Sequence, residues 1–277
     1  ETSIAELETK IADACKLQLA PSAPHVSFLN KITARKPCDP RVKIFTTNYD
    51  TLFEQAANKA GFVVIDGFSF THPRQFSGRY FDFDIVNREK TRLKHEDSFV
   101  KKVFHFHKLH GSLNWEKDND KIIIKDSPKV PLIIYPANEK YESSYEQPYF
   151  EMMARFQQAL RKDNVLLIVI GFGFQDKHIQ NVIIEAVEQN PSFQLVLVNY
   201  NLNESIDIKL FNVFFDSTVS VEDLESNNKN NNEINESIRA AIKRNVVIIF
   251  DTFKEFTEKF PENQTYIESI ETSDEAI

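Results

Sequence analysis

VLLIVIGFGFQD, residues 165–176, runs from an unbroken apolar stretch directly into a turn that contains two glycines. Six consecutive Val, Leu and Ile residues predict a short strand that is covered on both faces, as strands of parallel sheets are. Asp176 stands where a helix N-cap is expected, and apolar residues follow at helical spacing from Ile179 to Ala186. A strand, a turn and a helix in this order predict an α/β fold with a mostly parallel sheet.

Three further stretches have the same character. Residues 195–198 and 246–250 are short Val-, Leu- and Ile-rich runs, and residues 42–45 form a weaker run that leads into Thr-Thr-Asn-Tyr-Asp at 46–50. Their recurrence predicts a doubly wound, Rossmann-like sheet with helices on both faces.

Two more helices are expected beside these strands. One covers 51–60 and stops at Gly61, and Thr51 and Glu54 have the spacing of a capping box at its start. The other covers 252–260, after the last strand.

Composition limits the classes of protein that this chain fits. It has 277 residues, 42% hydrophobic residues and a net charge of −8, so it can bury a core, and most of its surface is unsuited to binding nucleic-acid phosphates. Cys15 and Cys38 are too few for a disulfide framework or a four-thiolate zinc site. The longest apolar run is far shorter than the roughly 20 residues of a membrane-spanning helix, and the first residues do not resemble a leader peptide. We therefore expect a cytoplasmic protein that does not enter a membrane.

We expect one domain over 1–277. Residues 67–145 are aromatic and irregular, which indicates an elaboration beside the sheet, and residues 201–245 have too little pattern for anything but a weakly ordered connection. One strand within the elaboration is expected to run into His110.

Polar residues and glycines collect where the predicted strands end. Ligands of open α/β sheets bind beyond the carboxyl ends of the strands, and strand-to-helix turns offer free backbone N–H groups. Taken singly, the two aspartates serve as helix N-caps and the glycines only turn the chain; taken together at successive strand ends, the residues favour a ligand site. The candidates are Thr47, Asn48, Asp50, Gly171, Gly173, Asp176 and Asn199.

His110 is the candidate proton-transfer group. It ends the predicted strand and precedes Gly111, whose lack of a side chain permits a sharp turn and the approach of a ligand. An imidazole with a pKa near about 6.5 can accept a proton at neutral pH. A structural histidine is the alternative. His105 and His107 form a His-x-His pair without a third ligand, so we expect no metal site.

Three ordered blocks resemble those of the sirtuin-like superfamily: FTTNYD at 45–50, KLHGSLNW at 108–115 and GFGFQD at 171–176. Together with IYP at 134–136 they look like its bacterial branch, found in antiphage defence systems. Similarity around 68–83 and 149–156 is nearest to the sirtuin-like subunit that pairs with a HerA-type hexameric ATPase.

The resemblance implies a Rossmann-like domain that hydrolyses NAD to nicotinamide and ADP-ribose and so depletes NAD in the infected cell. It implies that Asn48 holds the ribose or a water, that Asp50 supports that site, and that His110 is the acid/base residue. It further implies a homo-oligomer and a HerA-type ATPase partner. Expected NAD contacts are Thr47, Gly171, Gly173, Asp176 and Asn199.

Two departures from the family pattern stand out. The paired cysteines of the zinc module in deacylating sirtuins are missing, which disfavours protein deacylation. The family's N-terminal glycine-rich phosphate loop is also absent from 1–44, so we expect the native polypeptide to extend upstream of Glu1 and to contain a strand that ends in such a loop. A non-catalytic sensor of NAD or ADP-ribose is the alternative outside the enzymes.

Overall fold

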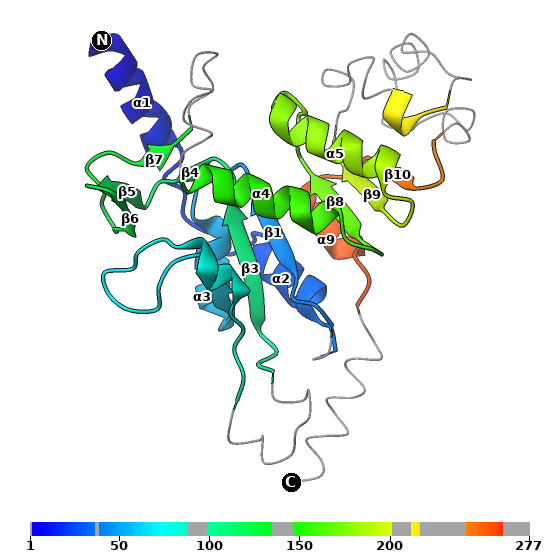
Figure 1. Ribbon diagram of the computed structural model, residues 1–277, viewed down its shortest axis with the longest axis horizontal. Helices are drawn as coiled ribbons and strands as arrows, with labels where there is room; N and C mark the ends of the chain where they lie inside the picture. The colour runs from blue at the N-terminus through cyan, green and yellow to red at the C-terminus, as the bar shows by residue number, and fades with distance from the viewer. Residues whose placement is uncertain are drawn as a thin grey trace. The chain divides into compact units, whose positions relative to one another are not determined.

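A computed structural model describes residues 2–36, 39–87, 99–134, 147–200, 212–216 and 242–262. The chain divides into two compact units, which Figure 1 draws without determining their relative placement. Unit 1 comprises residues 1–153 and 260–277, and unit 2 comprises residues 154–259.

Unit 1 is built on a three-stranded parallel sheet. The strands β1 (Lys43–Thr46), β2 (Val63–Ile65) and β3 (Val103–Lys108) lie in the order β1-β3-β2. All six residues of β3 are buried, as expected for a central strand with both faces covered.

Two helices cover one face of this sheet. They are α2 (His25–Thr33) and α3 (Leu52–Ala60), and α1 (Thr2–Ala14) precedes them (Figure 1). Phe104 and Phe106 of β3 pack with Leu29 of α2 and with Ala56 of α3 in one buried cluster. The apolar positions of α3 therefore face the sheet, as its 3.6-residue periodicity predicts.

An aromatic layer covers the other face. The ring of Phe81, in the 3₁₀ helix η1 (Gly78–Asp82), stacks on His107 with 4.1 Å between centroids and 11° between planes. Phe45 stacks on His107 as well, at 4.4 Å. Phenylalanines therefore lie on one face of β3 and histidines on the other, as the two-residue periodicity of a strand requires.

Four short strands complete the described part of unit 1. The strand β4 (Gly111–Ser112) pairs with β7 (Leu132–Ile133), and β5 (Trp115–Asp118) pairs with β6 (Lys121–Ile124), both antiparallel. These pairs lie within the elaboration predicted at 67–145, of which 88–98 and 135–145 fall outside the described residues. The helix α4 (Tyr149–Leu160) follows and continues into unit 2.

Unit 2 contains the strand that the apolar run at 165–170 predicts. The strands β8 (Leu166–Ile170), β9 (Gln194–Val198) and β10 (Val246–Ile249) form a parallel sheet in the order β10-β9-β8. The helix α5 (Lys177–Gln189) connects β8 to β9, and α9 (Phe253–Lys259) follows β10 (Figure 1). The predicted α/β class with parallel, Rossmann-like strand–helix units is confirmed, and its described main strands fall into two three-stranded sheets.

Thr-x-x-Glu patterns stand at the starts of α3 and α9, and one of these two forms a capping box. Thr51 makes no side-chain cap, so the predicted box at the start of α3 is wrong, and Glu54 pairs with Lys108 of β3 instead. At α9 the reciprocal bonds exist: the Thr252 backbone N–H donates to Glu255 Oε2 at 2.9 Å, and the Glu255 N–H donates to Thr252 Oγ1 at 3.3 Å.

The predicted connection at 201–245 lies mainly outside the described residues, which include only 212–216 and 242–245 of it. Across the described part of the chain, no helix combines the length and the apolar character needed to cross a bilayer.

Candidate functional site

The carboxyl ends of β1 and β3 lie side by side in unit 1. Thr46 pairs with Lys108, and the Leu109 N–H donates to the Thr46 carbonyl at 2.8 Å. Thr47 and Asn48 therefore leave the sheet beside the point where His110 follows β3. The structure brings these predicted residues to one edge of one sheet, which is where ligands of parallel sheets bind.

The loop after β1, residues 47–51, is shaped by local hydrogen bonds. The Asn48 N–H donates to Thr46 Oγ1 at 3.1 Å, and the Asn48 side chain is exposed. Asp50 Oδ1 accepts the Leu52 N–H at 2.9 Å, so this carboxylate satisfies a free N–H group at the start of α3. The N-cap residue of α3 is Thr51, so the expectation that Asp50 is the N-cap is wrong, although its carboxylate does bind an N–H group of the first turn. Asn48 is the exposed residue of this loop.

The 47–51 loop is also fastened to the end of β3. The Leu113 N–H donates to the Tyr49 carbonyl at 3.1 Å, and Lys108 Nζ donates to the Asp50 carbonyl and, at 3.0 Å, to Glu54 Oε1. The Lys108 side chain is 3% exposed, so a charged amine is held inside the protein directly beneath the candidate site.

His110 is half-buried in the turn after β3. Its carbonyl accepts the Ile134 N–H at 2.9 Å, and the Tyr49 hydroxyl donates to the Ile134 carbonyl. The 47–51 loop, the His110 turn and the residue after β7 therefore form one hydrogen-bonded assembly. This assembly fixes the backbone that carries the imidazole.

Gly111 has a different role from the one predicted. Its φ of +83° is in the left-handed region, and a β-carbon there would overlap the Leu132 carbonyl oxygen. The space beside this glycine is filled by β7, so the prediction that it gives a ligand room is wrong. Gly111 makes the close pairing of β4 and β7 possible.

His105 and His107 are core residues. Both are buried, and His107 lies between the rings of Phe45 and Phe81. Within the residues that the structure describes, no group of three or more His, Cys, Asp and Glu side chains is arranged to hold a metal ion. Cys38 falls outside those residues, and the expected absence of zinc stays a prediction.

The remaining candidates lie in unit 2, at the carboxyl ends of β8 and β9. Gly171 has a φ of +63°, and its N–H donates to the Val198 carbonyl at 2.9 Å. Gly173 is exposed, and a β-carbon there would meet no described atom within 4 Å. Asn199 Nδ2 donates to the Phe172 carbonyl at 3.4 Å, which ties the glycine turn to the end of β9.

Asp176 is the N-cap of α5. Its Oδ1 accepts the N–H groups of His178 at 2.9 Å and Ile179 at 3.2 Å. The prediction that Asp176 is a helix N-cap is confirmed, and its carboxylate stabilises the start of α5.

Burial shifts the pKa values of two groups on and beside α3. Burial raises the pKa of the Glu54 carboxyl. The positive charge of Lys108 opposes this shift, and the negative charge of Asp50 reinforces it. Burial also lowers the pKa of His25, against the attraction of Asp50. The negative charge of Asp50 is therefore felt by several groups beneath the strand ends.

The ion pair between Lys108 and Glu54 is the feature of this region that was not predicted from the sequence. Lys108 stands in the KLHGS block, and its alternation with Phe104 and Phe106 places it on the face that α3 covers. A lysine on an otherwise apolar strand face, opposite a helix with an acid in its first turn, is the signal that predicts such a pair.

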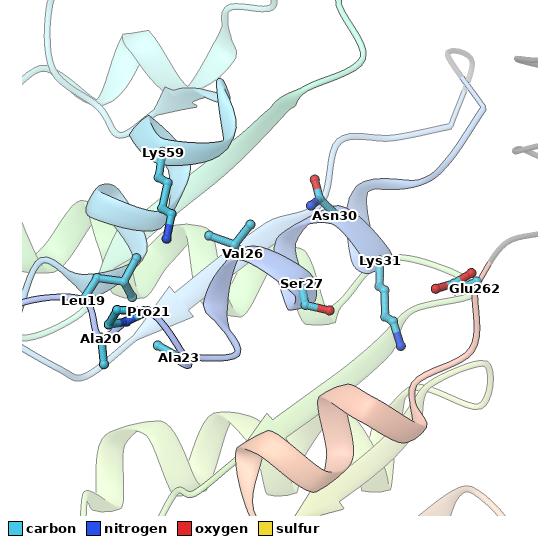
Figure 2. Close-up of a pocket in the computed structure, with 10 residues that line it drawn as sticks. All are labelled: Leu19, Ala20, Pro21, Ala23, Val26, Ser27, Asn30, Lys31, Lys59 and Glu262. Atoms are coloured by element: carbon cyan, nitrogen blue, oxygen red, sulfur yellow. The ribbon is translucent and has the colours of Figure 1, made fainter.

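A shallow pocket of about 480 Å³ lies elsewhere in unit 1, beside α2 (Figure 2). Apolar side chains such as Leu19 and Val26 line it together with Asn30, Lys31 and Lys59. None of the predicted site residues borders it, so it lends no support to the candidate site.

The family follows from comparison with known proteins. A protein-family model described as the SIR2-like domain matches residues 42–207, more than half of the chain. The chain belongs to the SIR2-like family. The matched segment of this SIR2-like domain extends from β1 through β9 and includes every predicted site residue. SIR2-like domains use NAD as their substrate, and the family is generally enzymatic. No curated protein matches the chain.

Proposed function

We propose that this SIR2-like protein is an NAD glycohydrolase that cleaves NAD to nicotinamide and ADP-ribose. The observation that carries the proposal is the arrangement at the edge of the β1-β3-β2 sheet. There, Asn48 and His110 follow neighbouring strand ends that are joined by the Leu109–Thr46 and Leu113–Tyr49 backbone bonds.

The chemistry requires little from the protein beyond this arrangement. When the bond between ribose C1′ and the pyridinium nitrogen breaks, its electron pair neutralises the pyridinium, so nicotinamide leaves without a proton donor. The sugar passes through an oxocarbenium-like state, as in glycoside hydrolysis. A water then adds to C1′ and loses one proton. In this proposal Asn48 orients the ribose or the water, and the His110 imidazole accepts the proton.

Asp50 acts in this proposal through the backbone. Its side chain holds the first turn of α3 by accepting the Leu52 N–H, which keeps the loop with Asn48 in place. In this proposal its negative charge also favours the positive charge that develops on the sugar.

The glycine turn of unit 2 supports a nucleotide contact. No described atom would lie within 4 Å of a β-carbon on Gly173, and this residue does not have a left-handed φ. Neither packing nor backbone conformation therefore requires a glycine here, whereas close approach of a ligand to the backbone does. Thr47, Gly171, Asp176 and Asn199 remain proposed neighbours of the bound NAD.

The biological setting that we propose rests on the family resemblance alone. It is antiphage defence in the cytoplasm by depletion of NAD, with the chain in a homo-oligomer and a HerA-type ATPase as its partner. Because an unrestrained NAD hydrolase would be toxic, we propose that its activity is gated by assembly.

Nicotinamide release tests the proposal against its alternatives. The purified protein is incubated with NAD alone, with NAD and an acylated peptide, and with its expected partner. Release from NAD alone or with the partner supports the hydrolase. Release that requires the peptide would make the protein a deacylase, and saturable NAD binding without release under any of these conditions would make it a sensor.

A further inference from the structure

The ammonium group of Lys108 is completely engaged by the chain segment that leads from Asn48 into α3. It donates to the carbonyl oxygens of Tyr49, at 3.4 Å, and of Asp50, and to Glu54 Oε1 at 3.0 Å. An ammonium has three N–H donors, and each has an acceptor here. The methylene stem lies in the core, with Nζ 5.7 Å from the centre of the Phe106 ring.

Stability alone explains this arrangement poorly. Removing an amine and a carboxylate from water costs several kcal/mol for each ion, and well-packed apolar residues often replace such pairs with no loss. The neighbouring positions on this face of β3, Phe104 and Phe106, show that the strand takes apolar side chains there. The pair is therefore better explained by what it holds in position.

What it holds is the loop of the candidate site. Two of the three acceptors are backbone carbonyls of residues 49 and 50, directly after Asn48, and the lysine itself stands two residues before His110. One side chain thus links the loop after β1 to the end of β3, the two segments on which the proposed chemistry depends. The backbone bonds from the Leu109 N–H to the Thr46 carbonyl and from the Leu113 N–H to the Tyr49 carbonyl join the same two segments.

We infer that Lys108 is a positioning residue for NAD cleavage, which holds the 47–51 loop so that Asn48 and His110 face the same reacting atoms. Glu54 balances the buried charge of Lys108 and makes no contact with the loop carbonyls in this role. The inference rests on the proposed function, but the fastening of the loop can be measured without any substrate.

The decisive variants are Lys108→Met, Glu54→Gln and the double variant. Lys108→Met removes all three bonds and leaves the Glu54 carboxylate buried without its cation, so it lowers both the melting temperature and kcat. In the double variant no unpaired charge is left, and the melting temperature recovers. We expect kcat to stay about 10- to 100-fold below that of the parent in the double variant, because the loop carbonyls are still released. Glu54→Gln alone keeps the loop bonds, so its kcat stays within about threefold of the parent.

Lys102 provides the matched control. It lies just before β3, donates to the Ala60 carbonyl at 2.9 Å and has its Nζ 5.5 Å from the centre of the Phe62 ring. Lys102→Met therefore removes the same kinds of interaction at the other end of the same strand. We expect kcat and KM for NAD to remain at the parent values.

Hydrogen exchange separates this inference from the proposed function. In Lys108→Met and in the double variant, we expect the amides of Asn48 and Leu113 to exchange at least about tenfold faster than in the parent, with no change in Lys102→Met. If kcat recovers together with the melting temperature in the double variant, or if exchange at these amides is unchanged, the positioning role is wrong. If the parent releases no nicotinamide under any condition, the proposed function fails, and the exchange comparison still decides whether Lys108 fastens the loop.

Discussion

Gly111 of β4 faces Leu132 of β7 so closely that a β-carbon on the glycine would overlap the Leu132 carbonyl oxygen. The glycine also has a φ of +83°. The position after His110 therefore requires glycine for two separate reasons: there is no space for a side chain, and the backbone has a left-handed φ.

Replacing Gly111 by alanine is expected to destabilise the protein by about 3 kcal/mol or more, since the left-handed φ and the overlap each cost roughly 1–3 kcal/mol. Urea unfolding measures the loss. Gly61→Ala is the control, because Gly61 has a similar φ of +71° but no described atom within 4 Å of a β-carbon. This control should lose only about 1 kcal/mol. Equal losses for the two variants would show that the β4–β7 contact adds no constraint.

Gly173→Ala is expected to leave the melting temperature unchanged and to weaken NAD binding. No described atom lies within 4 Å of the added methyl group, whereas a nucleotide that approaches the backbone at Gly173 would meet it. Calorimetric titration with NAD measures the affinity, and we expect a loss of at least about tenfold, or 1.4 kcal/mol. An unchanged affinity would remove Gly173 from the proposed NAD contacts.

The sequence predicted those parts of the fold that depend on local pattern. Runs of Val, Leu and Ile located β8, β9 and β10, and apolar residues at helical spacing located α3 and α5. The capping role of Asp176 followed from its place before the apolar positions of α5. In each case the neighbouring residues alone determine the element.

Features that depend on long-range partners were missed or misjudged. Thr-x-x-Glu patterns stand at the starts of both α3 and α9, but of these two the one at Thr252 forms a box and the one at Thr51 does not, because Lys108 of β3 binds Glu54. The ligand role expected for Gly111 failed because β7, 21 residues away in sequence at Leu132, occupies the space. The residues next to Glu54 and Gly111 in the sequence do not reveal these contacts, because Lys108 of β3 and Leu132 of β7 reach them only after the chain has folded.

His110→Ala and Asn48→Ala are each expected to lower nicotinamide release at least about 100-fold while the melting temperature stays within a few degrees of the parent. An acid/base group typically contributes 10²- to 10⁴-fold, and the Asn48 side chain is exposed, so its loss removes no core packing. His178→Ala and Asn58→Ala, at exposed positions of α5 and α3, are the matched controls and should retain parent activity. A variant that keeps half of the parent turnover would exclude its residue from the mechanism.

The capping box of α9 is expected to make stability depend on pH. The backbone N–H of Thr252, and then its hydroxyl, donate to Glu255 and lower the pKa of this carboxyl below its ordinary value of 4.5. A carboxyl whose pKa is lowered by folding stabilises the protein above its unfolded pKa, and the stabilisation is lost as the pH falls through the folded value. Glu255→Gln should therefore melt below the parent at pH 7, by a difference that is constant down to about pH 4.5 and disappears towards pH 3. The same substitution in a Thr252→Ala background, where one of the two hydrogen bonds is already missing, should give a smaller pH-dependent difference. Melting curves at half-unit steps between pH 3 and 7 measure both, and a difference that does not shrink in acid would mean that the charge of Glu255 contributes nothing to the start of α9.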